Sequence, residues 1–150
     1  MDKDKKIKGY DKDYFLFLEA GFVAVNQCDE DSALKLFMAA QTLRPDNAFP
    51  KIGYGYMHMC KLELKQAEEM FNAVIQSDPK NELALSFLGI TKSFMPNKTA
   101  EGEKILSELN KNTDDEDMKK LVSVSQSFID AHIKKTTTSP MDLAKPKKQK

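Results

Sequence analysis

Apolar residues recur at helical spacing along this chain, and polar residues separate one helical stretch from the next. The pattern is clearest between about residues 115 and 135, where apolar positions follow the i, i+3, i+4 spacing of one helix face. That face contains Met118, Leu121, Val122, Ser125, Phe128, Ile129, His132 and Ile133. Residues 114–117 are all acidic and suit a helix start, because negative side chains complement the helix dipole.

Six further helices are predicted upstream from comparable start and stop signals. We expect them at 11–27, at 29–43, from 46 or 47 onward, at 63–77, from 81 to about 95, and at 98–110. Pro45, Pro79 and Pro96 each follow an expected helix end, because proline disfavours helical geometry in the residue before it. Asn81 is a candidate N-cap, and Pro50 is tolerated in a first helical turn.

Within these helices the sequence repeats itself with a period of 34 residues. Glycine recurs at Gly21, Gly55 and Gly89, and three further residues recur with it in the first two units. These are the pairs Ala33 and Ala67, Phe37 and Phe71, and Pro45 and Pro79. A period of this length predicts an all-α array of helix-turn-helix units, about three in number, which stack and bind partners on one face.

The final unit and the chain ends depart from this pattern. In the third unit, Glu101, Ile105 and Thr113 stand where alanine, phenylalanine and proline are expected, so we predict a degenerate repeat. The last helix is predicted to cap the open end of the array. We therefore expect a charged N-terminal segment at 1–11, a repeat domain with its cap at 12–135, and a disordered lysine-rich tail at 136–150.

Composition narrows the class of partner. Lys plus Arg and Asp plus Glu both number 23, and this neutral balance disfavours nucleic acid. No apolar stretch approaches the ~20 residues that span a bilayer, and no secretory signal opens the chain. Cys28 and Cys60 form no disulfide framework. We expect a cytoplasmic protein without a membrane span.

No sequence motif of catalysis is present, so we expect a protein that is not an enzyme and needs no cofactor or metal. The segment Gly53-Tyr54-Gly55 lacks the strand and third glycine of a nucleotide-binding loop, which favours close helix packing instead. His58 and His132 are expected to be packing residues. Two cysteines and two histidines without ligand spacing do not predict a zinc site.

These repeated residues resemble the tetratricopeptide repeat (TPR) family over about residues 14–115. With the first position of each unit at Tyr14, Ala48 and Glu82, the glycines occupy the eighth position of that family's repeat. The resemblance implies that the second, fifth, ninth and twelfth positions line a concave groove. The apolar residues at these positions are Phe15, Leu18, Phe22, Val25, Phe49, Ile52, Tyr56, Met59, Leu83 and Ile90.

The apolar groove also indicates which TPR function to expect. Members of the family that bind the C-terminal carboxylate of heat-shock proteins use lysine, arginine and asparagine in the groove, whereas this chain has Leu18, Phe22, Gly53, Leu83 and Phe87 there. A short array with an apolar groove and a capping helix resembles the type III secretion chaperones of the bacterial cytoplasm.

That resemblance implies a chaperone that holds an aggregation-prone secreted subunit by an amphipathic or hydrophobic helix. The expected client is the needle subunit, bound in some chaperones of this kind beside a small co-chaperone. A class II translocator chaperone and a scaffold that joins two folded proteins are the alternatives. We expect Phe22, Phe49, Ile52 and Tyr56 to anchor the client.

Overall fold

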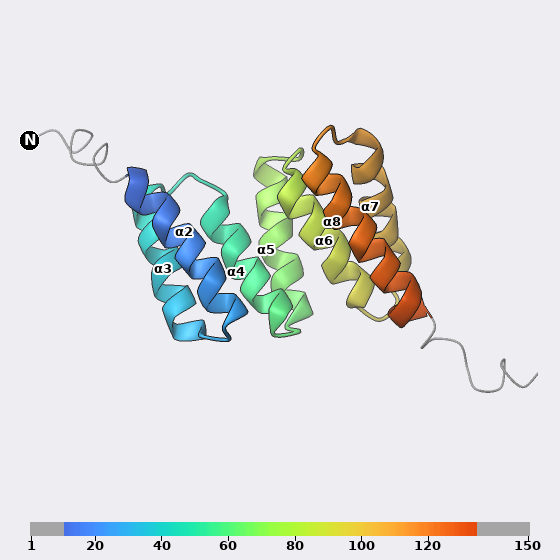
Figure 1. Ribbon diagram of the computed structural model, residues 1–150, viewed down its shortest axis with the longest axis horizontal. Helices are drawn as coiled ribbons and strands as arrows, with labels where there is room; N and C mark the ends of the chain where they lie inside the picture. The colour runs from blue at the N-terminus through green and yellow to red at the C-terminus, as the bar shows by residue number, and fades with distance from the viewer. Residues whose placement is uncertain (1–10, 135–150) are drawn as a thin grey trace, which may run out of the picture.

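The computed structural model describes residues 11–134, and within that range every regular element is helical. The α-helices are α2 (Asp11–Asn26), α3 (Glu30–Leu43), α4 (Phe49–Cys60), α5 (Leu64–Ser77), α6 (Glu82–Phe94), α7 (Thr99–Asn112) and α8 (Glu116–Phe128), and α8 continues into a π-helical turn, η2 (Ile129–Ile133). Figure 1 shows the pairs α2–α3, α4–α5 and α6–α7 following one another along the long axis of the molecule, with α8 against α6 and α7. The predicted all-α array is confirmed. Of the segment predicted to be charged, 1–11, Asp11 belongs to α2, and residues 1–10 and the predicted disordered tail at 136–150 lie outside the described residues.

Side-chain caps set the starts of three helices close to where the sequence predicts them. The carboxylate of Asp29 accepts a hydrogen bond from the backbone N–H of Ser32 at 3.1 Å, and hydrogen bonding to Ser32, first to its side chain and then to its backbone, lowers the pKa of Asp29. Asn81 accepts from the N–H of Ala84 at 3.0 Å. Asp115 accepts from the N–H groups of Asp117 and Met118. The polar residues between the helices therefore satisfy N–H groups that have no partner inside the helix.

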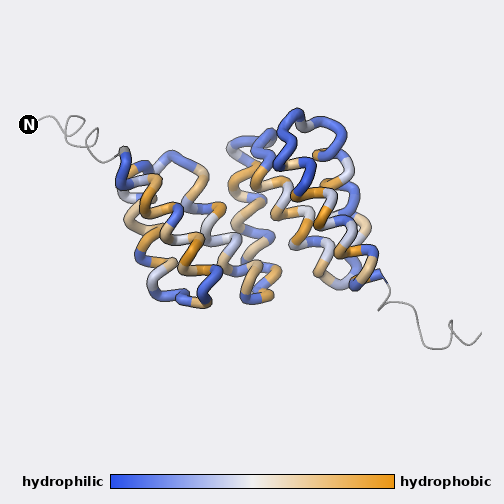
Figure 2. Tube along the Cα trace, in the orientation of Figure 1, coloured by the Kyte–Doolittle hydropathy of each residue, from blue (hydrophilic) through white to orange (hydrophobic). Residues whose placement is uncertain are grey.

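Helices that follow one another in sequence pack as pairs, α2 with α3, α4 with α5 and α6 with α7. Helix α8 lies against α6 and α7 and covers the end of the array, as predicted. The side of α8 turned away from these helices carries Lys120, Ser123 and Ser127, all exposed. Figure 2 shows hydrophobic residues recurring along the helices and a hydrophilic turn between α7 and α8. The array is therefore closed at this end by a mostly polar surface, with the exposed Val124 beside Lys120 and Ser123.

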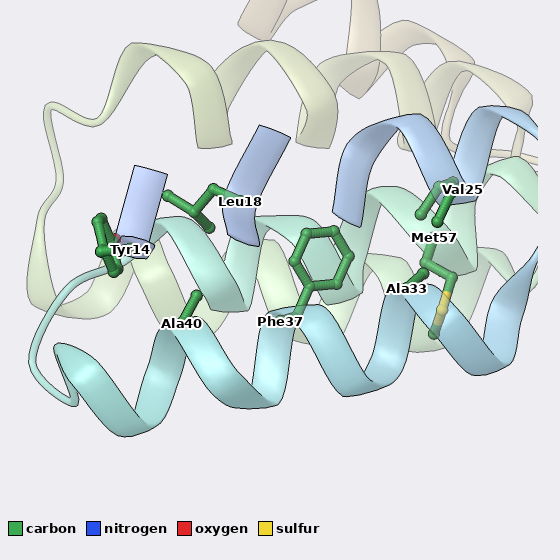
Figure 3. Close-up of a cluster of buried hydrophobic side chains, with 8 residues drawn as sticks. Tyr14, Leu18, Val25, Ala33, Phe37, Ala40 and Met57 are labelled. Atoms are coloured by element: carbon green, nitrogen blue, oxygen red, sulfur yellow. The ribbon is translucent and has the colours of Figure 1, made fainter. Parts of the chain in front are cut away.

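The core of the first two pairs is built around the ring of Phe37 on α3. A Cβ atom placed on Gly21 of α2 or on Gly53 of α4 would lie 2.5 Å from Cε1 of Phe37. The ring therefore fills a gap that only two glycines leave open. Figure 3 shows it rising from α3 between Leu18 and Val25, in a cluster that also holds Met57 of α4.

The second pair repeats half of this arrangement. A Cβ atom on Gly55 of α4 would lie 2.6 Å from Cε1 of Phe71 on α5. On its other side, Phe71 meets the aromatic ring of Phe87 on α6, at a centroid distance of 5.7 Å, where the first pair meets Gly53. The glycine period read from the sequence therefore marks the places where the two helices of a pair approach most closely.

The third pair keeps the same packing with a shift of one residue, and it differs from the first two in residue type, with glycine and leucine in place of alanine and phenylalanine. Gly102 and Leu106 of α7 are buried, and Leu106 lies against Gly89 as Phe71 lies against Gly55. Gly102 follows Ala67 by 35 residues, whereas Ala67 follows Ala33 by 34. The cause is the turn at 95–98, which is one residue longer than the turns at 27–29 and 61–63.

Each of these three turns contains one residue in the left-handed region of backbone space. Cys28 has a φ of 60°, Leu62 of 61° and Asn97 of 64°. Asparagine tolerates this conformation. In leucine the contact between Cβ and the neighbouring carbonyl oxygen raises the conformational free energy by an amount on the order of 1–2 kcal/mol. Leu62 is also 71% exposed, so little burial offsets the strain.

We expect Gly55→Ala to destabilise the protein. The added Cβ would overlap the Phe71 ring, and overpacking of this kind typically costs about 1–3 kcal/mol. Chemical denaturation measures the change, with Lys51→Ala on the exposed side of α4 as the control. An unchanged free energy of unfolding for Gly55→Ala would show that the ring has room to move.

We expect Leu62→Gly to stabilise the protein by about 0.5–1 kcal/mol, because glycine adopts a positive φ without steric cost. Leu62→Ala keeps the Cβ atom and should give no such gain, which makes it the matched control. Thermal unfolding of both variants measures the difference. Equal melting temperatures for the glycine and alanine variants would contradict the prediction of strain.

Candidate functional site

Three of the ten predicted groove residues belong to the core. Leu18, Val25 and Ile52 are 5%, 7% and 0% exposed. The fifth position of the repeat is buried in all three pairs, by Leu18, Ile52 and Ser86, and the twelfth is buried in the first and third, by Val25 and Ser93. The expectation that these three residues line an accessible surface was therefore wrong, and Ile52 is not available as an anchor for a partner.

The other seven predicted residues reach the surface to different degrees. Phe15 and Phe49 are exposed, at 53% and 43%. The half-buried residues are Phe22, Tyr56, Met59, Leu83 and Ile90. The two exposed phenylalanines occupy the same place in successive pairs, near the starts of α2 and α4, and we call them the N-terminal patch.

The residues at the ninth and thirteenth repeat positions form a surface that runs across the first helices of the pairs. In α2 these are Phe22 and Asn26, and in α4 they are Tyr56 and Cys60. The rings of Phe22 and Tyr56 lie 5.6 Å apart, and the Tyr56 hydroxyl donates a hydrogen bond to Oδ1 of Asn26 at 2.8 Å. Adjacent helices therefore present these residues side by side, and we call this surface the first-helix face.

The same surface continues across α6 and α8, where it forms an apolar cleft of about 310 Å³. The cleft is lined by Ile90, Phe94, Val124, Ser125, Phe128 and Ile129. Phe94 and Phe128 lie with their ring centroids 5.9 Å apart and are 38% and 46% exposed, and Val124 is 69% exposed. We call it the α6–α8 cleft.

Of the cleft residues, the groove prediction from the sequence named Ile90 alone. Phe94 follows Ile90 by one helical turn, and Phe128 follows Val124 in the same way, so an i, i+4 pattern was the available signal. Phe128 was instead assigned to the buried face of the last helix. Val122 and Ile129 form the buried side of α8, and Val124 and Phe128 form a second, exposed apolar side.

Charge is absent from the first-helix face. The eight residues that represent its two rows on α2, α4, α6 and α8 are all uncharged, and they are Phe22, Asn26, Tyr56, Cys60, Ile90, Phe94, Val124 and Phe128. Charged side chains pair with each other elsewhere. Lys92 binds Glu101 at 2.8 Å and lies 3.6 Å from Glu68, which also binds Lys98 at 2.9 Å. These ion pairs join α5, α6 and α7 where their turns meet.

The polar groups in the middle of the first-helix face are occupied within the protein. Because its hydroxyl already bonds Asn26, Tyr56 has no need of a partner's polar group to satisfy that hydroxyl. Burial raises the pKa of Tyr56, with a smaller contribution from Cys60. Burial likewise raises the pKa of the Cys60 thiol, against a hydrogen bond with Tyr56 that lowers it. This thiol is therefore poorly suited to act as a nucleophile.

The two histidines differ in their surroundings. His58 is half-buried, and its Nδ1 lies 2.6 Å from Oε2 of Glu63, so it links the end of α4 to the turn before α5. The hydrogen bond to His58 is the largest cause of the lowered pKa of Glu63. His132 is exposed and stacks on Phe128 at 4.6 Å, contrary to the expectation that it packs inside. Among the described residues, no three His, Cys, Asp or Glu side chains gather to hold a metal ion.

A separate apolar strip faces the free end of the array. Leu16 and Val23 on α2 are 59% and 53% exposed, whereas the equivalent Pro50 and Met57 on α4 are buried against the preceding pair. This strip is thus a packing surface of the repeat that has no helix pair before it in the described range.

The protein was compared with family models, curated proteins and solved structures, and none of them matches it. Between residues 11 and 134, no helix is both long and apolar enough to cross a lipid bilayer. What this chain binds must therefore be inferred from its own surface.

We expect the Cys60 thiol to react slowly with iodoacetamide at neutral pH, because its raised pKa leaves little thiolate. In a Cys28→Ser variant, which leaves Cys60 as the single thiol, the rate should be lower in the folded protein than in urea, and it should climb as the pH rises above the normal range for cysteine. A folded-state rate equal to that in urea would contradict the raised pKa of this thiol.

Proposed function

We propose that this chain is a TPR-type binding module that covers the apolar side of a partner's amphipathic helix. The observation that carries the proposal is the uncharged first-helix face, on which Phe94 and Phe128 stay partly open to water, together with Phe15 and Phe49 of the N-terminal patch. Large exposed apolar surfaces of soluble proteins typically mark binding sites. A helix laid across such a surface buries its own apolar side in the same step.

The size of the hydrophobic gain supports a binding role over a purely structural one. Fully burying a phenylalanine side chain contributes about 1.5–3 kcal/mol, and these four phenylalanines retain between 38% and 53% of their exposure. Covering them together is favourable by a few kcal/mol before the cost of association. A partner that self-associates through an apolar helix gains from the same burial.

We propose further that the partner is a secreted subunit held before export, and that the chain is a type III secretion chaperone for the needle subunit. The basis is the resemblance of a short, apolar-faced array with a capping helix to those chaperones. A translocator client and a scaffold between two folded proteins are the competing outcomes. A secreted client should aggregate when this chain is withheld, whereas a folded partner of a scaffold should not, and the two chaperone hypotheses differ in which subunit is captured.

The test is co-expression with defined clients, the needle-type and translocator-type subunits of the same organism. We expect Phe15→Glu and Phe49→Glu to reduce client capture at least tenfold, because each buries a charge against the client's apolar side. Met38→Glu is the matched control, since Met38 on α3 is 60% exposed and lies on a second helix of a pair. Melting temperatures verify that all variants fold.

Equal capture by the two phenylalanine variants and the Met38 control would contradict the proposed binding face. Capture of the translocator but not of the needle subunit would support the binding face and show that the client is a translocator. A partner that stays soluble and monodisperse without this chain would favour the scaffold.

A further inference from the structure

We infer that the partner helix is held at two separate apolar patches, the N-terminal patch and the α6–α8 cleft, and that it carries two apolar clusters about four helical turns apart. This inference rests on the proposed function and specifies the partner that the same face accepts. In it, α8 is part of the binding surface as well as the cap of the array.

The middle of the face separates the two patches. Tyr56 of α4 lies there, with its hydroxyl bonded to Asn26 and its ring 5.3 Å from the ring of Phe87 on α6, and both rings are half-buried. The strongly exposed apolar side chains lie to either side of Tyr56, with Phe15 and Phe49 near the starts of α2 and α4 and Phe94, Val124 and Phe128 on α6 and α8. A partner helix is therefore expected to meet exposed apolar side chains near its two ends and half-buried rings at its centre.

The distance between the patches sets the spacing of the partner's clusters. The N-terminal patch lies between α2 and α4 and the cleft between α6 and α8, which is two helix spacings along the array, or about 16–20 Å. Phe15 and Phe49 hold the second repeat position and the cleft is centred between the ninth and thirteenth, about nine residues later, which adds an offset of about 13–15 Å along the helix axes. The combined separation is about 20–25 Å, which a helix crosses in about 15 residues.

The chemistry of the cleft selects an apolar segment over other ligands. All six lining residues are uncharged, and Ser125 is the one hydroxyl among them. A phosphate or a carboxylate would find no cation there, and a charged side chain would lose its hydration without compensation. The cleft is open on one side, so two apolar side chains one turn apart on a helix can enter it from above.

Two designed helical peptides of equal composition probe this arrangement directly. Each has about 24 residues, two pairs of leucines at i, i+4 spacing, and alanine, lysine and glutamate elsewhere. In the wide peptide the centres of the pairs are about 15 residues apart, and in the narrow peptide about 7. Fluorescence anisotropy with the full-length protein should show the wide peptide binding about tenfold more tightly or better.

The protein variants assign the contact to the cleft. Val124→Glu should weaken binding of the wide peptide about tenfold or more, since Val124 is 69% exposed and its substitution leaves the core untouched. Ser123→Glu, the adjacent exposed position on the polar side of α8, is the matched control and should leave the affinity unchanged. If Val124→Glu lowers the melting temperature, Val124→Ser removes the same apolar contact without a charge.

The outcomes separate this inference from the proposed function. If Phe49→Glu abolishes client capture and Val124→Glu binds peptide and client as well as Ser123→Glu, the binding face stands and the two-patch arrangement is overturned. A wide peptide that binds no better than the narrow one, or does not bind, also overturns it. If neither Phe49→Glu nor Val124→Glu affects the client, both are wrong.

Discussion

The whole arrangement depends on an aromatic ring entering a gap that glycine leaves between two helices. Phe37 occupies such a gap between Gly21 and Gly53, and Phe71 meets Gly55 in the same way. Because protein interiors are close-packed, the size of the ring fixes how near the helices approach. That distance in turn decides which neighbouring side chains are covered. Leu18 and Val25 fall on the covered side, within the cluster around Phe37.

The exposed face is the counterpart of this packing. One side of each first helix packs against the second helix of its pair, and the rest of its surface contacts the neighbouring pairs or solvent. The residues left toward solvent at the ninth and thirteenth positions carry no charge, although exposed helix positions in soluble proteins are commonly charged. The polar side of α8, with Lys120 and Ser123, shows that this chain places polar residues where a surface is to remain free. The contrast within one helix supports a distinct role for Val124 and Phe128.

Much of the fold was predictable from the sequence because the determining contacts are local. Caps such as Asp29 and Asn81 act within one turn, and the glycine and phenylalanine of a pair lie 16 residues apart at a fixed offset. The third pair was misread because a strict 34-residue comparison reaches Ile105, whereas one added turn residue brings Leu106 to the packing position. A turn length is set by local backbone geometry, here the left-handed Asn97, and no apolar period reports it.

The binding face was less predictable, for a different reason. Helical spacing identifies the apolar side chains, but it does not tell which of several neighbours covers each one. Ile52 and Tyr56 are one turn apart on α4, yet Ile52 is fully buried and Tyr56 half-buried, because Ile52 lies within the cluster around Phe71 whereas Tyr56 packs at its edge against Phe22 and Phe87. On α8, the apolar spacing assigned the exposed Phe128 to the same face as the buried Val122 and Ile129, and only the positions of α6 and α7 separate these two sides.

The unequal contacts of Phe37 and Phe71 also affect which helices unfold together. Phe37 touches glycines of two pairs, and its cluster contains Met57 of α4, so the first two pairs share one core. The far end has a cluster of its own, formed by Leu106, Leu109, Val122 and Ile129. In a linear array, stability is a sum of terms within units and between neighbours. Backbone amides of α2, α3 and α4 should therefore lose hydrogen-exchange protection as one cooperative unit, and Phe71 of α5, which shares a cluster with Ile52 of α4 and Leu88 of α6, couples that unit to the far end.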